Sequence, residues 1–287
     1  MEHQTAQHDI PALDQWAKDL GDIGWFIPPF VQMGVLDQVV KAARATASFG
    51  QSQLEAELIQ IYRPISLAAM LTERYVQAAV IQDYAVTIGE AIEAHVLGLD
   101  HLAVGGLVPV IEGAGRRLAV LNGLSGDGHL KVVFGSLIEA CKSQAQDRKL
   151  GTVGEVLSML DSFGTFLDRY LYAGSSRYPL ADKTNRHGIA HGAYDDADYG
   201  RPINFYKTIA AIDFLTFVST FVGGGSWMAP PLTPRALLLA RSWLEQRATR
   251  DARLGRTLGE PMATELSELR DAASWLATLP LDDAMQL

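Results

Sequence analysis

An arginine and two histidines lie close together in the octapeptide N-R-H-G-I-A-H-G at 185–192, as Arg186, His187 and His191. A histidine can take up or release a proton at neutral pH because its ordinary pKa is about 6.5. An arginine stays charged, and its planar guanidinium fits two phosphate oxygens. Cleavage of RNA without a metal needs a base for the ribose 2′-hydroxyl, an acid for the leaving 5′-oxygen and positive charge at the phosphate. These residue types therefore predict a site that handles a phosphodiester.

The spacing of these residues restricts how they can meet. Arg186 and His191 are five positions apart, which is about 140° around the axis of an α-helix. Their side chains converge only if the segment bends or if a second subunit supplies one of them. Gly188 and Gly192 lower the helix propensity of the octapeptide, so they favour a bend or a strained backbone.

Two other interpretations of the octapeptide are open. His187 and His191 are four positions apart, as zinc ligands on one helix face would be, and an aspartate of the D-D-A-D turn at 195–198 would complete the site. The zinc motif H-E-x-x-H is incomplete, however, because position 188 is glycine. In a purely structural interpretation, His191 is a hydrogen-bonded core residue and Arg186 pairs with Asp182 on an extended helix.

Apolar residues three and four positions apart dominate the chain, which predicts an all-α fold. The clearest helix covers 153–171 and is expected to stop at A-G-S-S, 173–176. Another helix follows Pro202 and extends to Val222, with apolar residues nearly all around it. We expect this helix at the centre of a bundle or at a subunit interface.

Further helices and breaks divide the chain. Residues 84–120 predict two helices, the second kinked at Pro109 because proline clashes with the carbonyl four residues earlier. The paired prolines of G-W-F-I-P-P-F, 24–30, predict an extended segment whose aromatic side chains pack on the core. The pattern as a whole predicts an N-terminal helical region at 1–82, a central helical bundle at 83–222 and a C-terminal helical tail at 223–287.

The composition is that of a globular protein, with 48% hydrophobic and 20% charged residues among 287. The formal net charge of −9 argues against a protein that coats duplex DNA, but it allows a local phosphate site. Cys141 is the single cysteine, which indicates a reducing compartment. The first residues do not resemble a secretory signal, and Lys207 and Asp213 disfavour 203–225 as a membrane span. We expect a cytoplasmic protein with no membrane partner.

Other residues have side chains capable of chemistry. His95 and His101 flank the junction between the two helices of 84–120, where either is able to join a site, although we expect them at the surface. Six arginines crowd the stretch 235–256, where they suit RNA or an acidic partner; an ordinary solvated helix face is the simpler interpretation.

The string R-H-G-I-A-H at 186–191 resembles the Arg-polar-x3-His signature of HEPN domains, with His187 where those domains usually carry Asn, Asp or His. The flanking sequence is similar to that of bacterial proteins in which a helical E-A-H block precedes the motif and an aspartate-rich Y-G turn follows it. Here these parts are 93–95 and 195–200, and the resemblance covers about residues 84–222. It implies a HEPN-like helical bundle that forms a homodimer, with two copies of the motif in one cleft.

The resemblance also implies roles for individual residues. His191 is the expected general acid and base, and Arg186 the expected phosphate-binding residue. Other residues are expected to orient, polarise or bind the substrate: Asn185, His187, Glu112 and Tyr199.

The implied activity is that of a metal-independent endoribonuclease that needs no cofactor and leaves a 2′,3′-cyclic phosphate. Such domains serve as toxins or antiphage effectors, so the expected partners are RNA or a nucleotide, a second copy of the chain, and an antitoxin or another partner protein. The alternative is an inactive HEPN-like module that binds nucleotides or dimerises.

Overall fold

The computed structural model describes residues 11–45 and 49–258, and these residues form helices and loops without a β-strand. The all-α prediction is therefore confirmed. The helices are α1 (Pro11–Asp22), α2 (Met33–Ala45), α3 (Gln51–Ile61), α4 (Pro64–Met70), α5 (Ala85–Val96), α6 (Asp100–Leu121), α7 (Leu130–Arg148), α8 (Val153–Phe166), α9 (Arg186–Ala190), α10 (Pro202–Gly223) and α11 (Pro234–Leu258). Short turns continue or connect them: the π-helical η1 (Leu71–Tyr75) and η3 (Leu167–Leu171), and the 3-10 helical η2 (Ile81–Tyr84) and η4 (Ser175–Arg177).

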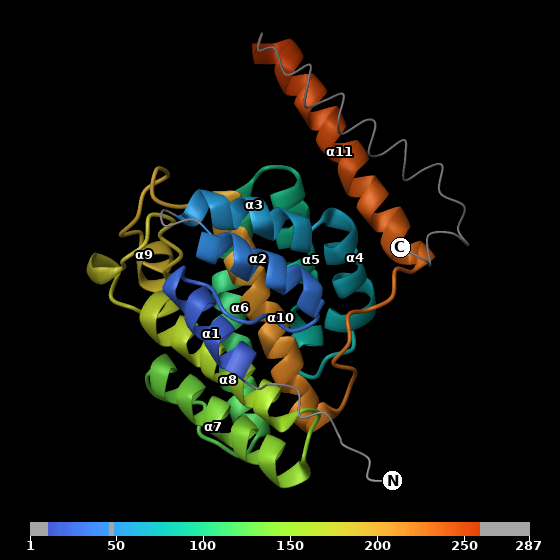
Figure 1. Ribbon diagram of the computed structural model, residues 1–287. Helices are drawn as coiled ribbons and strands as arrows, with labels where there is room; N and C mark the ends of the chain where they lie inside the picture. Colours follow the sequence, from blue (N-terminus) through green and yellow to red (C-terminus); the bar gives the residue numbers. More distant parts are fainter. Residues whose placement is uncertain (1–10, 46–48, 259–287) are drawn as a thin grey trace.

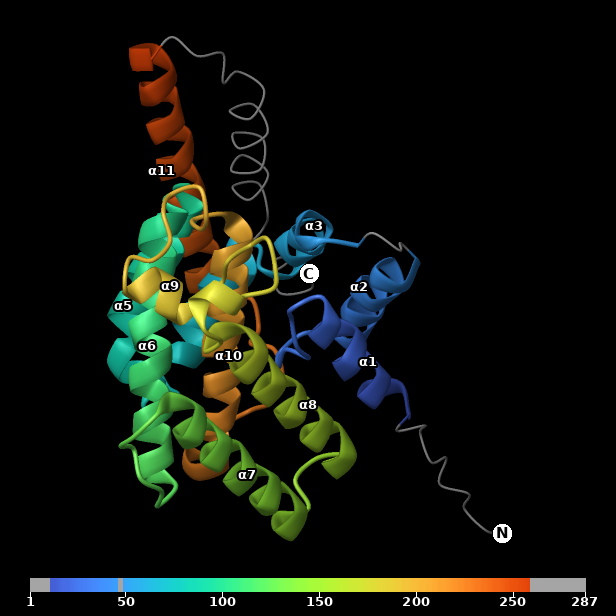
Figure 2. The same cartoon turned by 90° about the vertical axis from the view of Figure 1, so that its left-hand side faces the viewer.

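Helix α10 lies at the centre of the bundle (Figures 1 and 2). Eighteen of its 22 residues are buried, and α6 and α3 pack against it. By length and apolar composition alone α10 would also fit a membrane span, yet 89% of its most apolar stretch is buried inside the bundle. The helix thus takes the first of its two expected positions, and no second subunit is needed to cover it.

The segment between α1 and α2 is not helical and packs its aromatic side chains into the core, as predicted, although it turns at Gly24 and Phe30 and is not extended throughout. Trp25 and Phe26 are fully buried. The ring centroid of Phe26 lies 5.1 Å from that of Phe163 on α8 and 5.8 Å from that of Phe214 on α10, and the last two rings stack at 4.1 Å. These aromatic contacts hold the N-terminal helices on the central helices.

The predicted helix at 153–171 is present as α8 followed directly by η3, and it ends before η4 as expected. The two helices expected in 84–120 are also present. Helix α6 continues through Pro109, so the proline does not end it. One further helix, α11, contacts α4 and projects from the bundle (Figures 1 and 2).

The three predicted regions share one hydrophobic core within the described residues. Its buried side chains extend along the chain from Leu13 to Trp243, and α1 packs on α8 while α3 packs on α10. The N-terminal helices are therefore part of the same packed body as the central bundle. Residues 259–287 of the predicted C-terminal tail lie outside the described residues.

Candidate active site

The octapeptide folds as a very short helix with a specific end at each side. Asn185 is the N-cap, and its side-chain oxygen accepts a hydrogen bond from the Gly188 amide at 2.9 Å. At the other end Gly192 has a φ of +64°, a left-handed conformation that glycine adopts at little cost. The Ala193 amide donates to the Gly188 carbonyl at 2.9 Å, and the Gly192 amide donates to the Ile189 carbonyl at 3.4 Å, the hydrogen bonds of a Schellman motif. Gly192 is thus explained by the helix end, and Gly188 by the Tyr194 ring, which lies where a Cβ atom at position 188 would be.

This helix end brings the chemically active side chains together. His191 follows the last helical residue, and its backbone has left the helical conformation. Arg186 Nη1 lies 2.7 Å from His191 Nε2 and 3.4 Å from His187 Nδ1. The two imidazole rings are nearly parallel, with centroids 5.8 Å apart. The bend that the spacing requires is present within one chain, and Arg186 and His191 meet without a second subunit.

The contact with arginine determines the protonation of both histidines. A guanidinium can only donate hydrogen bonds, so His191 Nε2 must accept and the proton of its neutral ring must sit on Nδ1. Burial, followed by the charge of Arg186, lowers the pKa of His187 below its ordinary value. His187 is therefore held in a form that is able to accept a proton, whereas His191 Nε2 becomes free to do so only when Arg186 Nη1 turns to a substrate.

Glu112, expected to bind the substrate or to support the residues that do, holds the arginine. Its carboxylate on α6 forms an ion pair with Arg186, accepting from Nε and from Nη2, the latter at 3.2 Å. Both side chains are 19% exposed. The edge formed by Nε and Nη2 is thereby used by Glu112, and Nη1 remains on the histidine side.

Tyr172 lies beside this ion pair and was not predicted as a site residue. It is buried, and its hydroxyl has no hydrogen-bond partner among the described residues. Burial and then the carboxylate of Glu112 raise its pKa, so the hydroxyl keeps its proton. The sequence gives no sign that Tyr172 lies beside the site, because this residue only continues the apolar pattern of the preceding helix.

Asn185 occupies a position different from the one expected of a residue that orients the reacting groups. It is completely buried. Its side-chain amide donates to the carbonyl oxygens of Tyr170 at 3.0 Å and Ala173 at 2.8 Å. With its oxygen on Gly188, both ends of the amide are used by the backbone. Asn185 therefore positions α9 and does not face a substrate.

Tyr199 and the acidic turn at 195–200 also differ from expectation. The ring of Tyr199 packs edge-on against His101, with centroids 5.0 Å apart, and not against the arginine and histidines of the octapeptide. Asp195 accepts a hydrogen bond from the Ala197 amide within the turn. In the part of the chain that the structure describes, no three His, Cys, Asp or Glu side chains gather closely enough to hold a metal ion. The turn thus supplies neither the expected substrate contact nor a third zinc ligand.

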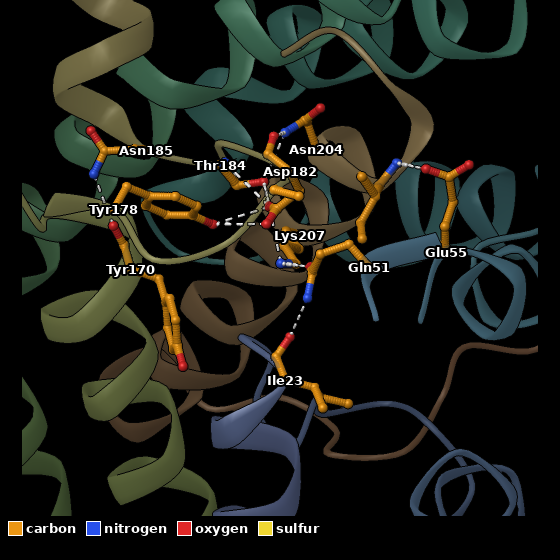
Figure 3. A network of polar contacts seen from close by, with 12 residues as sticks. Ile23, Gln51, Glu55, Tyr170, Tyr178, Asp182, Thr184, Asn185, Asn204 and Lys207 are labelled. Carbon is orange, nitrogen blue, oxygen red and sulfur yellow. Dashed lines mark hydrogen bonds and ion pairs between the residues drawn. The ribbon is translucent and has the colours of Figure 1, made fainter. Parts of the chain in front are cut away.

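A buried polar network anchors the segment that leads into α9 (Figure 3). Asp182 accepts hydrogen bonds from Lys207 Nζ at 3.0 Å, from the Tyr178 hydroxyl at 3.0 Å and from the side chain of Thr184. Asp182 and Lys207 are completely buried. The predicted pairing of Asp182 with Arg186 is therefore wrong. Asp182 forms its ion pair with Lys207, and Arg186 forms its ion pair with Glu112.

The same network reaches the N-terminal helices (Figure 3). Asn204 donates to the Asp182 carbonyl at 2.5 Å and to the Thr184 hydroxyl at 2.9 Å. Lys207 also donates to the side-chain oxygen of Gln51 at 2.6 Å, and Gln51 in turn donates to the Ile23 carbonyl at 2.9 Å. The position of the loop before Arg186 thus depends on α10 and on α3.

Two charges persist in this network because they neutralise each other. Burial by itself would raise the pKa of Asp182, but the Lys207 ammonium reverses this effect. The pKa of Asp182 therefore lies below its ordinary value. Burial lowers the pKa of Lys207, and the Asp182 carboxylate opposes that shift. Neither residue is free to exchange protons with a substrate, so the pair has a structural role.

Comparison of the chain with models of protein families, with curated proteins and with solved structures finds no match. The chemistry of this site is therefore inferred from its own residues.

Proposed function

We propose that this protein is a metal-independent endoribonuclease of HEPN type. The observation that carries the proposal is the direct contact of one arginine with two neutral histidines, Arg186 with His191 and His187, on the surface of the bundle. This set contains the residue types that phosphodiester cleavage without a metal requires. His187 and His191 are exposed, whereas Asn185 and Gly188 of the octapeptide are buried.

The proposed reaction is an internal transfer. One imidazole takes the proton of the ribose 2′-hydroxyl, and the 2′-oxygen forms a bond to phosphorus. The bond from phosphorus to the 5′-oxygen breaks, and the imidazolium formed in the first step donates its proton to that oxygen. Arg186 Nη1 compensates the negative charge of the phosphorane-like transition state. The products are a 2′,3′-cyclic phosphate and a 5′-hydroxyl, and we assign both proton transfers to His191, with His187, whose ring stacks on it, as the alternative.

A catalytically inactive nucleotide-binding or dimerisation module is the second candidate. The ion pair of Arg186 with Glu112 favours it, because the carboxylate occupies the Nε and Nη2 edge that a phosphate would bind in a bidentate way. An RNA phosphate must then either displace Glu112 or use Nη1 alone.

The expected partners remain part of the proposal. We propose RNA as substrate, a homodimer as the active form, an antitoxin or other protein as a possible regulator, and a cytoplasmic location.

The test is cleavage of total RNA by the purified protein in excess EDTA. We expect cleavage that leaves 2′,3′-cyclic phosphate ends and is lost in Arg186→Ala and in His191→Ala. Arg186→Lys should also lose most activity, because an ammonium cannot contact both Glu112 and His191. His101→Ala is the matched control, since His101 is a partly exposed histidine that contacts Tyr199 outside the octapeptide.

The outcomes separate the two candidates. Absence of cleavage, together with RNA binding that Arg186→Ala weakens, would establish the inactive module. Cleavage that survives both substitutions would place the active site elsewhere. Light scattering of the same samples tests the dimer.

A further inference from the structure

A second cavity lies away from the octapeptide, where α3, α5, α10 and α11 meet. Its volume is about 470 Å³, within the range of sites that bind small organic molecules. Aromatic and aliphatic side chains form most of its wall, among them Tyr62, Tyr206, Ile59 and Leu244. The cavity is therefore suited to a ligand with an apolar body.

An oriented histidine lines this cavity. His95 Nδ1 lies 2.6 Å from Asp100 Oδ1, and a carboxylate there accepts the Nδ1 proton. The imidazole stacks on Phe205 with a centroid distance of 3.8 Å and an interplanar angle of 7°. The expectation that His95 is a surface residue is thus wrong, because its side chain is only 11% exposed. Its Nε2 makes no hydrogen bond with a described residue and is available to a ligand.

An arginine lines the other side of the cavity. Arg247 on α11 donates from Nε to Asp251 at 2.5 Å and from Nη1 to the Val96 carbonyl at 3.0 Å. These bonds hold the guanidinium over the turn at Gly98, where a Cβ atom would come within 2.9 Å of Nη1. The Nη2 group makes no hydrogen bond with a described residue.

The polar groups that remain without partners are mainly donors, with one acceptor among them. The acids around the cavity are already used: Asp100 by His95, Asp251 by Arg247, and Glu55 by the Ile203 amide at 3.1 Å. Arg247 Nη2 donates, and the hydroxyls of Tyr206 and Tyr62 donate or accept. His95 Nε2 accepts while the ring is neutral, because its proton is on Nδ1. A carboxyl group complements this set, since one oxygen accepts from Arg247 Nη2 and the acid proton is shared with His95 Nε2.

We propose that the cavity binds a small carboxylate with an aromatic or aliphatic body, and that Arg247 and His95 bind its carboxylate group. The proton on His95 Nε2 enters either with the acid or from solvent. A single negative charge fits better than the two of a phosphate ester, because Asp100, Asp251 and Glu55 lie close by. This binding site is independent of the proposed nuclease.

The test uses sodium 1-naphthoate and measures its binding to the full chain by calorimetry. We expect 1-naphthoate to bind at least about tenfold more tightly than 1-naphthamide, 1-naphthylmethylammonium or 1-naphthyl phosphate. Arg247→Gln should weaken naphthoate binding by about tenfold or more. Arg241→Gln is the matched control, because Arg241 also pairs with an acid four residues later on α11 but does not line the cavity.

Arg247 also compensates the buried Asp251, so thermal unfolding of each variant is measured first. If Arg247→Gln is unstable, Arg247→Gln with Asp251→Asn replaces it. In the wild type, naphthoate should shift the nitrogen resonance of His95 Nε2, which His95→Gln assigns. Equal binding of naphthamide, an unmoved His95 resonance, or no binding of naphthoate, benzoate or octanoate at millimolar concentration would each overturn the proposal.

Discussion

His187 is a histidine whose charge is controlled by the arginine next to it. Burial and the positive charge of Arg186 lower its pKa, so its titration midpoint should lie below about 6.5. Arg186→Met should raise the midpoint, because it removes a positive charge and leaves Glu112 in place. A titration followed by NMR measures both values, with Arg241→Met as the control. A midpoint that is the same in wild type and Arg186→Met would show that arginine does not set it.

This lowered pKa carries over to the proposed activity. If His187 acts as the base, the rate should fall only when the pH drops below its lowered pKa. The acidic limb of kcat/KM is therefore expected below pH 6.5. A limb at higher pH would assign the base to another residue.

Gly192 allows α9 to end where it does. A side chain at its φ of +64° is strained, so Gly192→Ala should lower the free energy of unfolding by about 1–2 kcal/mol. The same change should separate His191 from Arg186 and reduce RNA cleavage. Gly192→Asn should be milder, because asparagine tolerates this conformation. Gly34→Ala serves as the control in urea unfolding, since nothing lies near that helical glycine.

At this scale the residue types were predictable and their geometry was not. The octapeptide predicted an arginine and two histidines in one site, and the spacing correctly required a bend. That the helix ends at Ala190 and the chain turns at His191 depends on the hydrogen bonds that the Gly192 and Ala193 amides donate, which only the folded segment shows. Asn185 was expected to orient or polarise the reacting groups, but its partners are the carbonyls of an adjoining turn, to which the sequence pattern gives no guide.

Between the elements, the Asp182 and Lys207 pair fixes the loop before α9 to α10. Lys207→Met should cost about 3–5 kcal/mol of stability, because it leaves a buried carboxylate uncompensated. Adding Asp182→Asn should restore part of the loss. Lys41→Met is the matched control, since Lys41 pairs with Asp37 at the surface and should change stability by less than about 1 kcal/mol. Urea unfolding of the single and double variants gives the comparison, and equal losses in the two lysine variants would contradict it.

The helices themselves were largely predictable, because an apolar stripe or an apolar run specifies burial whatever it packs against. Helix α10 and the aromatic segment at 24–30 took their expected positions for this reason. The polar pairings between helices were not predictable. Asp182 is four residues from Arg186 in sequence, yet the loop between them turns its carboxylate inward to a lysine on another helix.

For the whole molecule, one buried acid should make stability depend on pH. Burial raises the pKa of Asp213 from 3.8 to about 7, although the Tyr75 hydroxyl donates to it at 2.5 Å. Between these values the folded chain holds a proton that the unfolded chain has lost. The free energy of unfolding should therefore fall by about 1.4 kcal/mol for each pH unit as the pH rises through this window.

Asp213→Asn removes the titrating carboxyl group, so the free energy of unfolding should depend less on pH. Above pH 7 the variant should then be more stable than the wild type. Urea unfolding at a series of pH values measures it. Asp127→Asn, at an exposed position, is the control. Parallel curves for wild type and Asp213→Asn would show that Asp213 is already charged in the folded state.

A chain of hydrogen bonds runs from Ile23 through Gln51, Lys207 and Asp182 to the loop before the octapeptide. Substitutions far from the octapeptide should therefore also impair its function. A screen for loss of its activity would recover substitutions of Gln51 in α3 together with substitutions in the octapeptide. Gln51 would be scored as functional although it does not touch a substrate. A fragment that keeps only the central bundle would likewise inherit Arg186 and both histidines without the support that holds them together.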